Sequence, residues 1–184
     1  KVYYLNNTLD INKLIKFKSE IPKKYLKEKY SINTKINGIF ISRFTKIKSP
    51  DLLKEIMIRI HNKNKDIGFI IIGDGNYKPD FSKYGFIYDF GSIYNTNKKS
   101  ELFNISNFSI MPSGIGLSIV ESFVFRLPMF TLSKEIEYIS HGVEYSYLKN
   151  NYNGIIAKNK FELVNKISNV KIEELENMGK RAYK

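Results

Sequence analysis

Two short segments of this 184-residue chain combine residue types that bind anions. The first, SRFTKIK at residues 42–48, places Arg43, Lys46 and Lys48 in a loop that follows an apolar run. Arginine can hold two phosphate oxygens at once, whereas lysine acts as a point charge. The segment therefore predicts a phosphate-binding loop; the alternative is one more lysine-rich surface loop.

The second segment, PSGIGLSIVE at residues 112–121, places a glycine-containing turn directly before a predicted helix. The first amides of a helix have no partners within it, and glycine lets a ligand approach the backbone. Glu121 falls about one turn into this helix, on an otherwise apolar stretch. A carboxylate there needs a polar partner, which ribose hydroxyls would supply. The alternative is that Glu121 lies on an exposed helix face.

Several other chemistries are excluded by residues that the sequence lacks. It contains no cysteine, so it has no disulfide and no cysteine nucleophile. It has no P-loop, no complete dinucleotide-binding glycine motif and no Asp-x-Asp that would hold a metal on a nucleotide. We interpret His61 as a surface residue and His141 as a loop residue, with ligand binding by His141 as the alternative. We predict neither a metal nor a cofactor.

Strands and helices must alternate to position these segments. Apolar runs predict strands at residues 38–44, 68–73, 86–90, 108–111, 129–132 and 154–157. Helical spacing predicts helices at residues 50–61, 98–105, 117–125, 161–170 and 172–183. Ser49 is the expected N-cap of the first of these helices. The alternation predicts an α/β fold with a doubly wound, Rossmann-like parallel sheet, whose ligand lies at the carboxyl ends of the strands.

The first 36 residues have a different pattern. Residues 2–5 predict a short strand, residues 6–8 a polar turn, and residues 13–36 a lysine-rich connector with a helical turn near residues 23–30. We therefore divide the chain into residues 1–36, the end of a preceding domain with its connector, and residues 37–184, a ligand-binding domain.

The chain is strongly basic, with 30 Lys and Arg against 18 Asp and Glu and a net charge of +12. Because 26 of the 30 are lysine, AT-rich coding and a solvated surface explain the charge most simply. Attraction to nucleic acid, an acidic membrane or a phosphate-bearing substrate is the functional alternative. The longest apolar run is too short to span a bilayer and no signal peptide is visible, so we expect a cytoplasmic protein.

In order along the chain, these segments resemble the C-terminal domain of GT-B glycosyltransferases, specifically glycosyltransferase family 4. The resemblance covers nearly the whole chain. It rests on VYYLNNTLD at residues 2–10, GIFISRFTKIK at 38–48, FIIIGDG at 69–75, IYDFGS at 87–92, SIMPSGIGLSIVESFVFRLP at 109–128, and the segment 142–154.

The resemblance implies the donor-binding domain of an enzyme that uses a nucleotide sugar. By this likeness Arg43 and Lys48 hold the diphosphate and stabilise its charge as it leaves, and Glu121 binds the ribose hydroxyls. Family members are retaining and metal-independent transferases. The donor-binding residues that the resemblance implies are Ser113, Gly114, Ile115, Gly116 and Leu117 at the phosphate, and Phe90 and Gly91 near the base.

Three positions depart from the family pattern. Ser113 stands where the family often has a glutamate that serves the donor sugar. Ser42 replaces the usual glycine before Arg43, and Arg126 replaces the usual glycine two residues before Pro128. A branch of the family that works on surface polysaccharides has a similar short Pro-x-x-x-Gly-Leu form, so we expect a role in surface polysaccharide or glycolipid synthesis.

The family's N-terminal acceptor domain is absent from this chain, so we expect a fragment that is inactive alone and binds nucleotide weakly. The implied partners are a nucleotide sugar and a glycan or lipid-linked acceptor bound through the missing domain. The lysine-rich surface also suits peripheral contact with the inner face of an acidic membrane. The main alternative is a non-catalytic nucleotide-binding or scaffolding module of the same fold. A nucleic-acid binder and an epimerase are lesser alternatives, and no nucleic-acid partner is expected.

Overall fold

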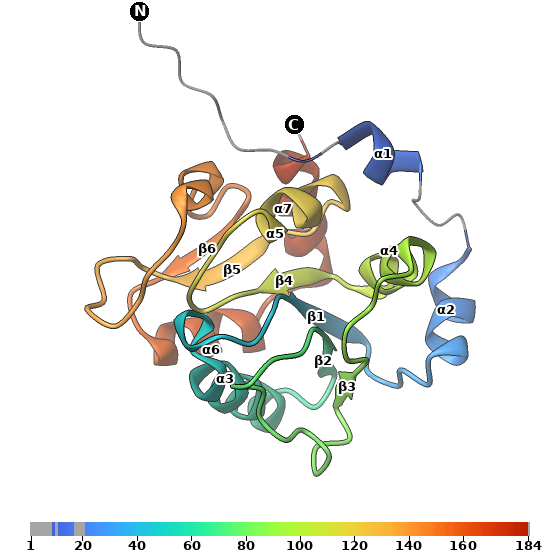
Figure 1. The fold of residues 1–184 in the computed structure, drawn as a ribbon, viewed down its shortest axis with the longest axis horizontal. Coiled ribbons are helices and arrows are strands. Elements are labelled where there is room, and N and C mark those ends of the chain that lie inside the picture. Colours follow the sequence, from blue (N-terminus) through green and yellow to red (C-terminus); the bar gives the residue numbers. More distant parts are fainter. Residues whose placement is uncertain (1–8, 10, 17–20, 184) are drawn as a thin grey trace, which may run out of the picture.

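The computed structural model describes residue 9, residues 11–16 and residues 21–183. Within these residues, six strands form one all-parallel sheet in the order β3-β2-β1-β4-β5-β6 (Figure 1). This arrangement confirms the predicted α/β, doubly wound, Rossmann-like fold. The strands are β1 (Ile36–Ile41), β2 (Ile67–Ile72), β3 (Ile87–Asp89), β4 (Phe108–Ile110), β5 (Met129–Leu132) and β6 (Gly154–Ala157).

Helices cover both faces of this sheet (Figure 1). The helices α3 and α6 pack together on one face, and α2 and α4 pack together on the other. Two short 3₁₀ helices, Lys46–Lys48 and Val143–Tyr147, lie in loops. The α-helices are α1 (Ile11–Lys16), α2 (Lys23–Lys29), α3 (Pro50–Lys63), α4 (Thr96–Ile105), α5 (Ser118–Val124), α6 (Lys160–Ser168) and α7 (Ile172–Ala182).

The central strands are apolar throughout because both of their faces are buried. In β1, Phe40 belongs to the core on the α3 and α6 side, and its neighbour Ile39 belongs to the core on the α2 and α4 side. Phe69 and Ile70 of β2 divide in the same way. Successive side chains of a strand point to opposite faces, so a strand covered on both sides needs an unbroken apolar run. Burial of each such side chain contributes about 1.5–3 kcal/mol.

The ends of several elements differ from the prediction. The strand expected at residues 38–44 is β1, Ile36–Ile41, so the boundary placed after residue 36 falls one residue inside it. Ser49 does occupy the N-cap position of α3, as expected, but its side chain makes no capping hydrogen bond and its backbone is left-handed, with φ 47°. The strand predicted at residues 2–5 and the turn at residues 6–8 lie outside the described residues.

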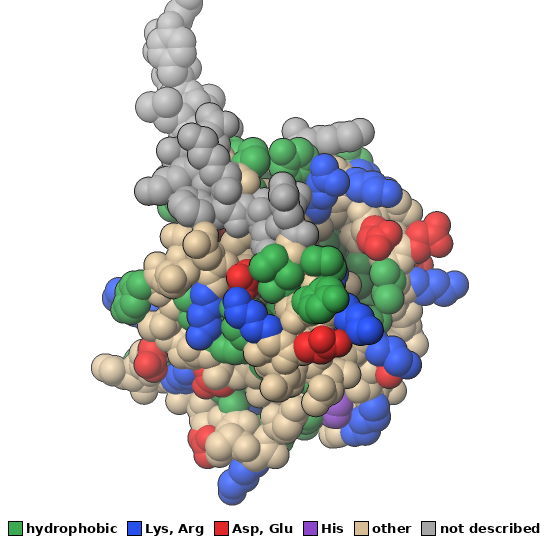
Figure 2. All heavy atoms as spheres, turned by 90° about the vertical axis from the view of Figure 1, so that its right-hand side faces the viewer, with side chains coloured by type: hydrophobic (Ala, Val, Ile, Leu, Met, Phe, Trp, Pro, Cys, Tyr) green, Lys and Arg blue, Asp and Glu red, His purple; other side chains and the backbone are tan. Residues whose placement is uncertain are grey.

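The surface that carries α2 and α4 is mixed in character. Figure 2 shows Lys and Arg side chains there between apolar and acidic ones. Ile21 and Tyr25 are exposed beside Lys23 and Lys24 on this segment. Among the described residues no helix has the length and apolarity needed to cross a bilayer.

The strand order turns at β1, and this turn determines where a ligand can bind. The chain adds β2 and β3 on one side of β1, and β4, β5 and β6 on the other. The loops that follow β1 and β4 therefore leave the same edge of the sheet in different directions. In doubly wound sheets the crevice between two such loops is the usual ligand site.

Candidate functional site

A cavity of about 390 Å³ opens at the carboxyl ends of the strands, where the strand order turns. Three of its lining side chains are cationic and one is a carboxylate, so the cavity attracts anions. Both predicted anion-binding segments contribute to it. The lining residues are Ile41, Ser42, Arg43, Lys48, Ile72, Gly73, Ser92, Ile93, Tyr94, Lys99, Gly116, Leu117, Ser118 and Glu121.

Arg43 and Lys48 reach the cavity from the loop after β1. Arg43 is exposed, whereas Lys48 is half-buried and its ammonium donates to the Gly114 carbonyl. Burial lowers the pKa of Lys48, and the nearby carboxylate of Glu144 opposes this shift. An ammonium group carries three donors, so Lys48 can join the loops after β1 and β4 and still bind a ligand oxygen.

Gly114 permits this contact between the two loops. Its φ is +74°, a conformation that side chains rarely adopt. A Cβ at this position would lie only 2.7 Å from Cδ of Lys48. The glycine is therefore needed both for its backbone conformation and for the space that Lys48 occupies.

Glu121 forms an ion pair with Lys99 of α4, with 2.5 Å between Oε1 and Nζ. The two side chains are 15% and 23% exposed, so water reaches the pair only partly. Lys99 is thus the polar partner that the position of Glu121 requires. An ionised carboxylate accepts more than one hydrogen bond, so Glu121 can also accept from a ligand hydroxyl.

The backbone of the Gly114 turn is held by the segment at residues 140–142. The Gly114 amide donates to the Ser140 carbonyl at 2.6 Å, and the Ile115 amide donates to Nδ1 of His141 at 3.2 Å. The hydroxyl of Ser113 donates to the Ser140 carbonyl at 3.1 Å and accepts from the Ser140 amide at 3.2 Å. Three consecutive residues are therefore tied to one neighbouring loop.

These bonds change what the turn offers to a ligand. The resemblance implies that the amides from Gly114 to Leu117 bind phosphate, but those of Gly114 and Ile115 already bond within the protein. Gly116 and Leu117 do line the cavity. Ser113 is buried and bonded to the neighbouring loop, and it does not line the cavity.

Phe90 and Gly91, expected near the base, lie just behind the cavity wall. Phe90 packs against the core on the α2 and α4 side. Gly91 has a φ of +62° and its carbonyl accepts from the Gly73 amide at 2.8 Å. The segment after β3 therefore reaches the site, but the three residues that follow Gly91 line the cavity in place of Phe90 and Gly91. These three residues are Ser92, Ile93 and Tyr94.

The two histidines both have defined partners. His61 is half-buried at the surface rather than freely exposed, because its ring stacks on Phe86 at 3.7 Å and its Nδ1 lies 2.8 Å from the Ile67 carbonyl. His141 is the loop residue that was expected, and its ring stacks on Tyr145 at 4.5 Å. Across the described part of the chain, no group of three or more acidic or histidine side chains could hold a metal ion.

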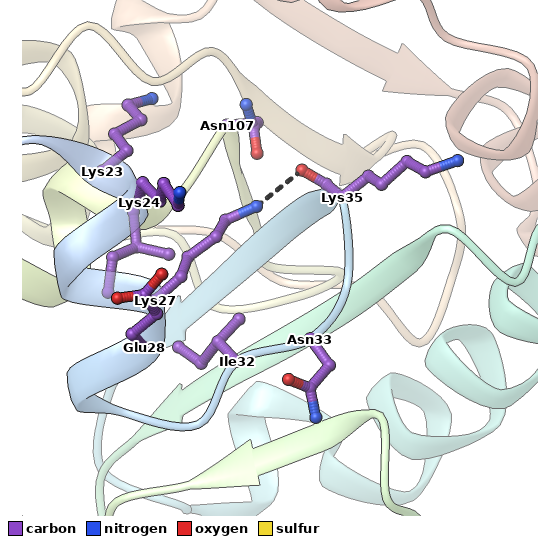
Figure 3. Close-up of a pocket in the computed structure, with 9 residues that line it drawn as sticks. Lys23, Lys24, Lys27, Glu28, Ile32, Asn33, Lys35 and Asn107 are labelled. Carbon is purple, nitrogen blue, oxygen red and sulfur yellow. Dashed lines mark hydrogen bonds between the residues drawn. The ribbon is translucent and has the colours of Figure 1, made fainter.

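A second cavity, also about 390 Å³, lies near the amino ends of β1 and β4 (Figure 3). Four lysines line it, but Lys27 donates to the carbonyls of Thr34 and Lys35, both at 2.9 Å. The ammonium of Lys35 points away from that of Lys27 (Figure 3) and pairs with Asp66 at 2.9 Å. Since neither predicted anion-binding segment contributes to this second cavity, we assign the candidate site to the cavity at the carboxyl ends.

The sequence and the fold both resemble those of sugar-transferring enzymes. The model of a family described as glycosyl transferases group 1 matches residues 35–170. The C-terminal domain of LpcC, a glycosyl transferase group 1 family protein of Francisella tularensis, has a TM-score of 0.73 and 17% identity, over 95% of this chain and 94% of that chain. HepE of Anabaena, solved with UDP and glucose, has a TM-score of 0.70 and 16% identity, over 96% of this chain and 50% of that chain.

TarM is a further structure with this fold, with a TM-score of 0.68 and 20% identity over 83% of this chain. The present chain spans only 32% of TarM. At these identities the solved structures show a shared fold. No curated protein sequence matches the chain significantly.

Proposed function

Because this chain belongs to the group 1 glycosyl transferases, we propose that it is the donor-binding domain of an enzyme that transfers a sugar from a nucleotide-sugar donor to a glycan or lipid-linked acceptor. The cavity at the turn of the strand order carries this proposal, because it brings Arg43 and Lys48 of the loop after β1 together with Glu121 of α5. HepE, which has the same fold, was solved with UDP and glucose.

Arg43 and Lys48 bind the donor diphosphate in this proposal. When the bond between the sugar and the diphosphate breaks, negative charge develops on the departing phosphate. Cations that are already in place stabilise this charge without reorganisation. We propose that they do so without a metal ion, since their positive charges face the same cavity.

Glu121 and the wall at residues 92–94 bind the nucleoside. The carboxylate of Glu121, held by Lys99, accepts from the ribose hydroxyls. Tyr94 is 93% exposed at the cavity, so its ring is free to stack on the base. The amides of Gly116 and Leu117 complete the phosphate side.

The remaining features of the proposed reaction follow from the family resemblance. We propose that transfer retains the anomeric configuration, that the acceptor binds to a separate N-terminal domain, and that the product is a surface polysaccharide or a glycolipid. Ser113 stands where the family often has a glutamate that serves the donor sugar, and its hydroxyl is bonded to Ser140. We therefore propose that other groups bind the donor sugar.

Calorimetric titration of the 184-residue chain with UDP, GDP and their sugar conjugates, with and without EDTA, tests the proposal. We expect one nucleotide to bind saturably, and EDTA to have no effect. Arg43→Ala should weaken binding by roughly tenfold or more, because a charge-assisted hydrogen bond contributes about 1.5–3 kcal/mol. Lys46→Ala is the matched control, since Lys46 belongs to the same loop but does not line the cavity. Absence of binding at millimolar nucleotide, or equal losses in both variants, would contradict the proposal.

We further propose peripheral contact with an acidic membrane through α2. Lys23 and Lys24 lie beside the exposed side chains of Ile21 and Tyr25, a combination that suits an anionic lipid surface. Sedimentation with liposomes should depend on anionic lipid and weaken in a Lys23→Ala, Lys24→Ala double variant. Equal sedimentation with neutral liposomes would contradict this contact.

A further inference from the structure

The turn at residues 114–116, whose last residue lines the cavity, is bonded to the neighbouring loop by two backbone bonds and one side chain. The segment at residues 140–142 pairs with the Gly114 turn through backbone bonds on both sides of Ile115. The Gly114 amide donates to the Ser140 carbonyl at 2.6 Å, and the Gly142 amide donates to the Ile115 carbonyl at 2.8 Å. Between these bonds, the Ile115 amide donates to the imidazole of His141 at 3.2 Å.

The partners of His141 determine which ring nitrogen carries the proton. A backbone amide can only donate, so Nδ1, which faces the Ile115 amide, must be the unprotonated nitrogen. The carbonyl of Leu132 can only accept, so Nε2, which lies 3.0 Å from it, must carry the hydrogen. The contacts therefore require a neutral ring in the Nε2–H form.

The surroundings of the ring favour this neutral form. Burial lowers the pKa of His141, the bond to the Leu132 carbonyl opposes this, and the charge of Lys48 lowers it further. The other ionisable groups nearby are two residues of the 3₁₀ helix that follows and one lysine from the segment after β5. Tyr145 stacks on the ring at 4.5 Å, and Glu144 is buried on the same element. Lys134 lies 6.0 Å from the centroid of the Tyr145 ring.

We propose that neutral His141 is a positioning residue for the donor site, holding the Ile115 amide so that Gly116 and Leu117 stand at the cavity wall. This inference rests on the proposed function. Protonation would place an N–H on Nδ1 opposite the Ile115 N–H, and two donors cannot bond. Ile115 is only 1% exposed, so its amide would have neither His141 nor water as an acceptor. The turn must then shift, and affinity for the donor falls as the pH falls.

Two substitutions separate the two hydrogen bonds of His141. In His141→Asn, the side-chain oxygen can take the place of Nδ1 and accept from the Ile115 amide at every pH. In His141→Gln, the longer side chain can bond the Leu132 carbonyl and leaves Ile115 without its acceptor. His61→Asn is the matched control, because His61 is a second histidine that lies on α3, outside the cavity.

The measurement is the affinity for UDP-glucose between about pH 8 and about pH 4.5, a range extended below that of an ordinary histidine because the pKa of His141 is lowered. The diphosphate of this probe is esterified at both ends and does not change its charge in this range. We expect the original chain and His61→Asn to lose roughly tenfold in affinity as the pH falls, since an unpaired buried amide has about that effect. His141→Asn should bind equally at both pH values, and His141→Gln weakly at both.

The same pH dependence in His141→Asn, or undiminished binding by His141→Gln, would overturn the inference. A measurement without ligand keeps it separate from the proposed function. The amide resonance of Ile115 should follow the titration of His141 in the original chain and stay constant in His141→Asn. If this resonance titrates but no nucleotide sugar binds, the proposed function fails. If UDP-glucose binds but the resonance does not titrate, the positioning role fails.

Discussion

Lys48 joins the loops after β1 and β4 and is also proposed to bind the diphosphate, whereas Arg43 is proposed only to bind the diphosphate. Its ammonium bonds the Gly114 carbonyl, whereas Arg43 is exposed. Lys48→Met should therefore lower both stability and nucleotide affinity, the stability by about 1–3 kcal/mol because the carbonyl of the buried Gly114 loses its donor. Arg43→Met should lower affinity and leave the melting temperature nearly unchanged. Thermal unfolding and calorimetry on both variants test this, and a Lys48→Met chain with full affinity would contradict it.

Glu121 gives a prediction that concerns the sugar of the nucleotide. If its carboxylate accepts from the ribose hydroxyls, the original chain should bind UDP more tightly than 2′-deoxy-UDP. In Glu121→Ala this preference should disappear, because the carboxylate that distinguishes a ribose with a 2′-hydroxyl from one without it is gone. The loss of the ion pair with Lys99 should weaken the binding of both ligands equally, so it does not affect the ratio of their affinities. A preference that survives the substitution would place the ribose elsewhere.

The site residues that could be predicted from the sequence lie in continuous segments. Arg43, Lys48 and Glu121 each follow a strand in a recognisable pattern, and the structure brings them to one cavity. Lys99 was missed because it lies on α4, in a segment with no motif of its own, and meets Glu121 only through packing. The acceptor role of His141 was missed for the same reason. Its bond to the Ile115 amide joins two distant segments, and no pattern of residue types along the sequence indicates it.

At the scale of elements, the loops after β1 and β2 approach each other so closely that glycine is required. Gly73 has a φ of +144°, and a Cβ there would lie 1.9 Å from the Ser42 carbonyl oxygen. Gly73→Ala should destabilise the fold by about 2–4 kcal/mol, as strained or overpacked sites do. Gly85→Ala is the control, because a Cβ at Gly85 would meet nothing within 4 Å and should change stability little. Equal melting temperatures in the two variants would contradict this account.

The strand predictions were most accurate where a backbone constraint marks the start of a strand. β5 and β6 have the predicted bounds, and Pro128 or Gly154 stands at their start. The prediction for β1 ran on to residue 44 because Phe44 is apolar. In the structure Phe44 lies in the loop after the strand and turns back into the core, where it is 1% exposed. Hydrophobicity alone does not distinguish a buried loop residue from a buried strand residue.

At the scale of the whole molecule, the strand order makes a single site from distant segments. Residues from the loops after β1, β2, β3 and β4 line one cavity because all the strands of the described sheet run parallel and end at one edge. The sequence predicted the parallel sheet from the alternation of strands and helices. The order of the strands depends on packing between elements, so it became known only from the structure.

The bonds between the Gly114 turn and residues 140–142 also have a kinetic consequence. They join groups of the chain itself and need no nucleotide to form, so we expect the turn that leads to Gly116 at the cavity to be in place before a nucleotide arrives. Association should then be a single step, whose observed rate in stopped-flow mixing rises in proportion to nucleotide concentration. A rate that levels off at high concentration would instead reveal a slow rearrangement. Differences between good and poor donors should therefore be found in how long each stays bound, rather than in how fast it enters.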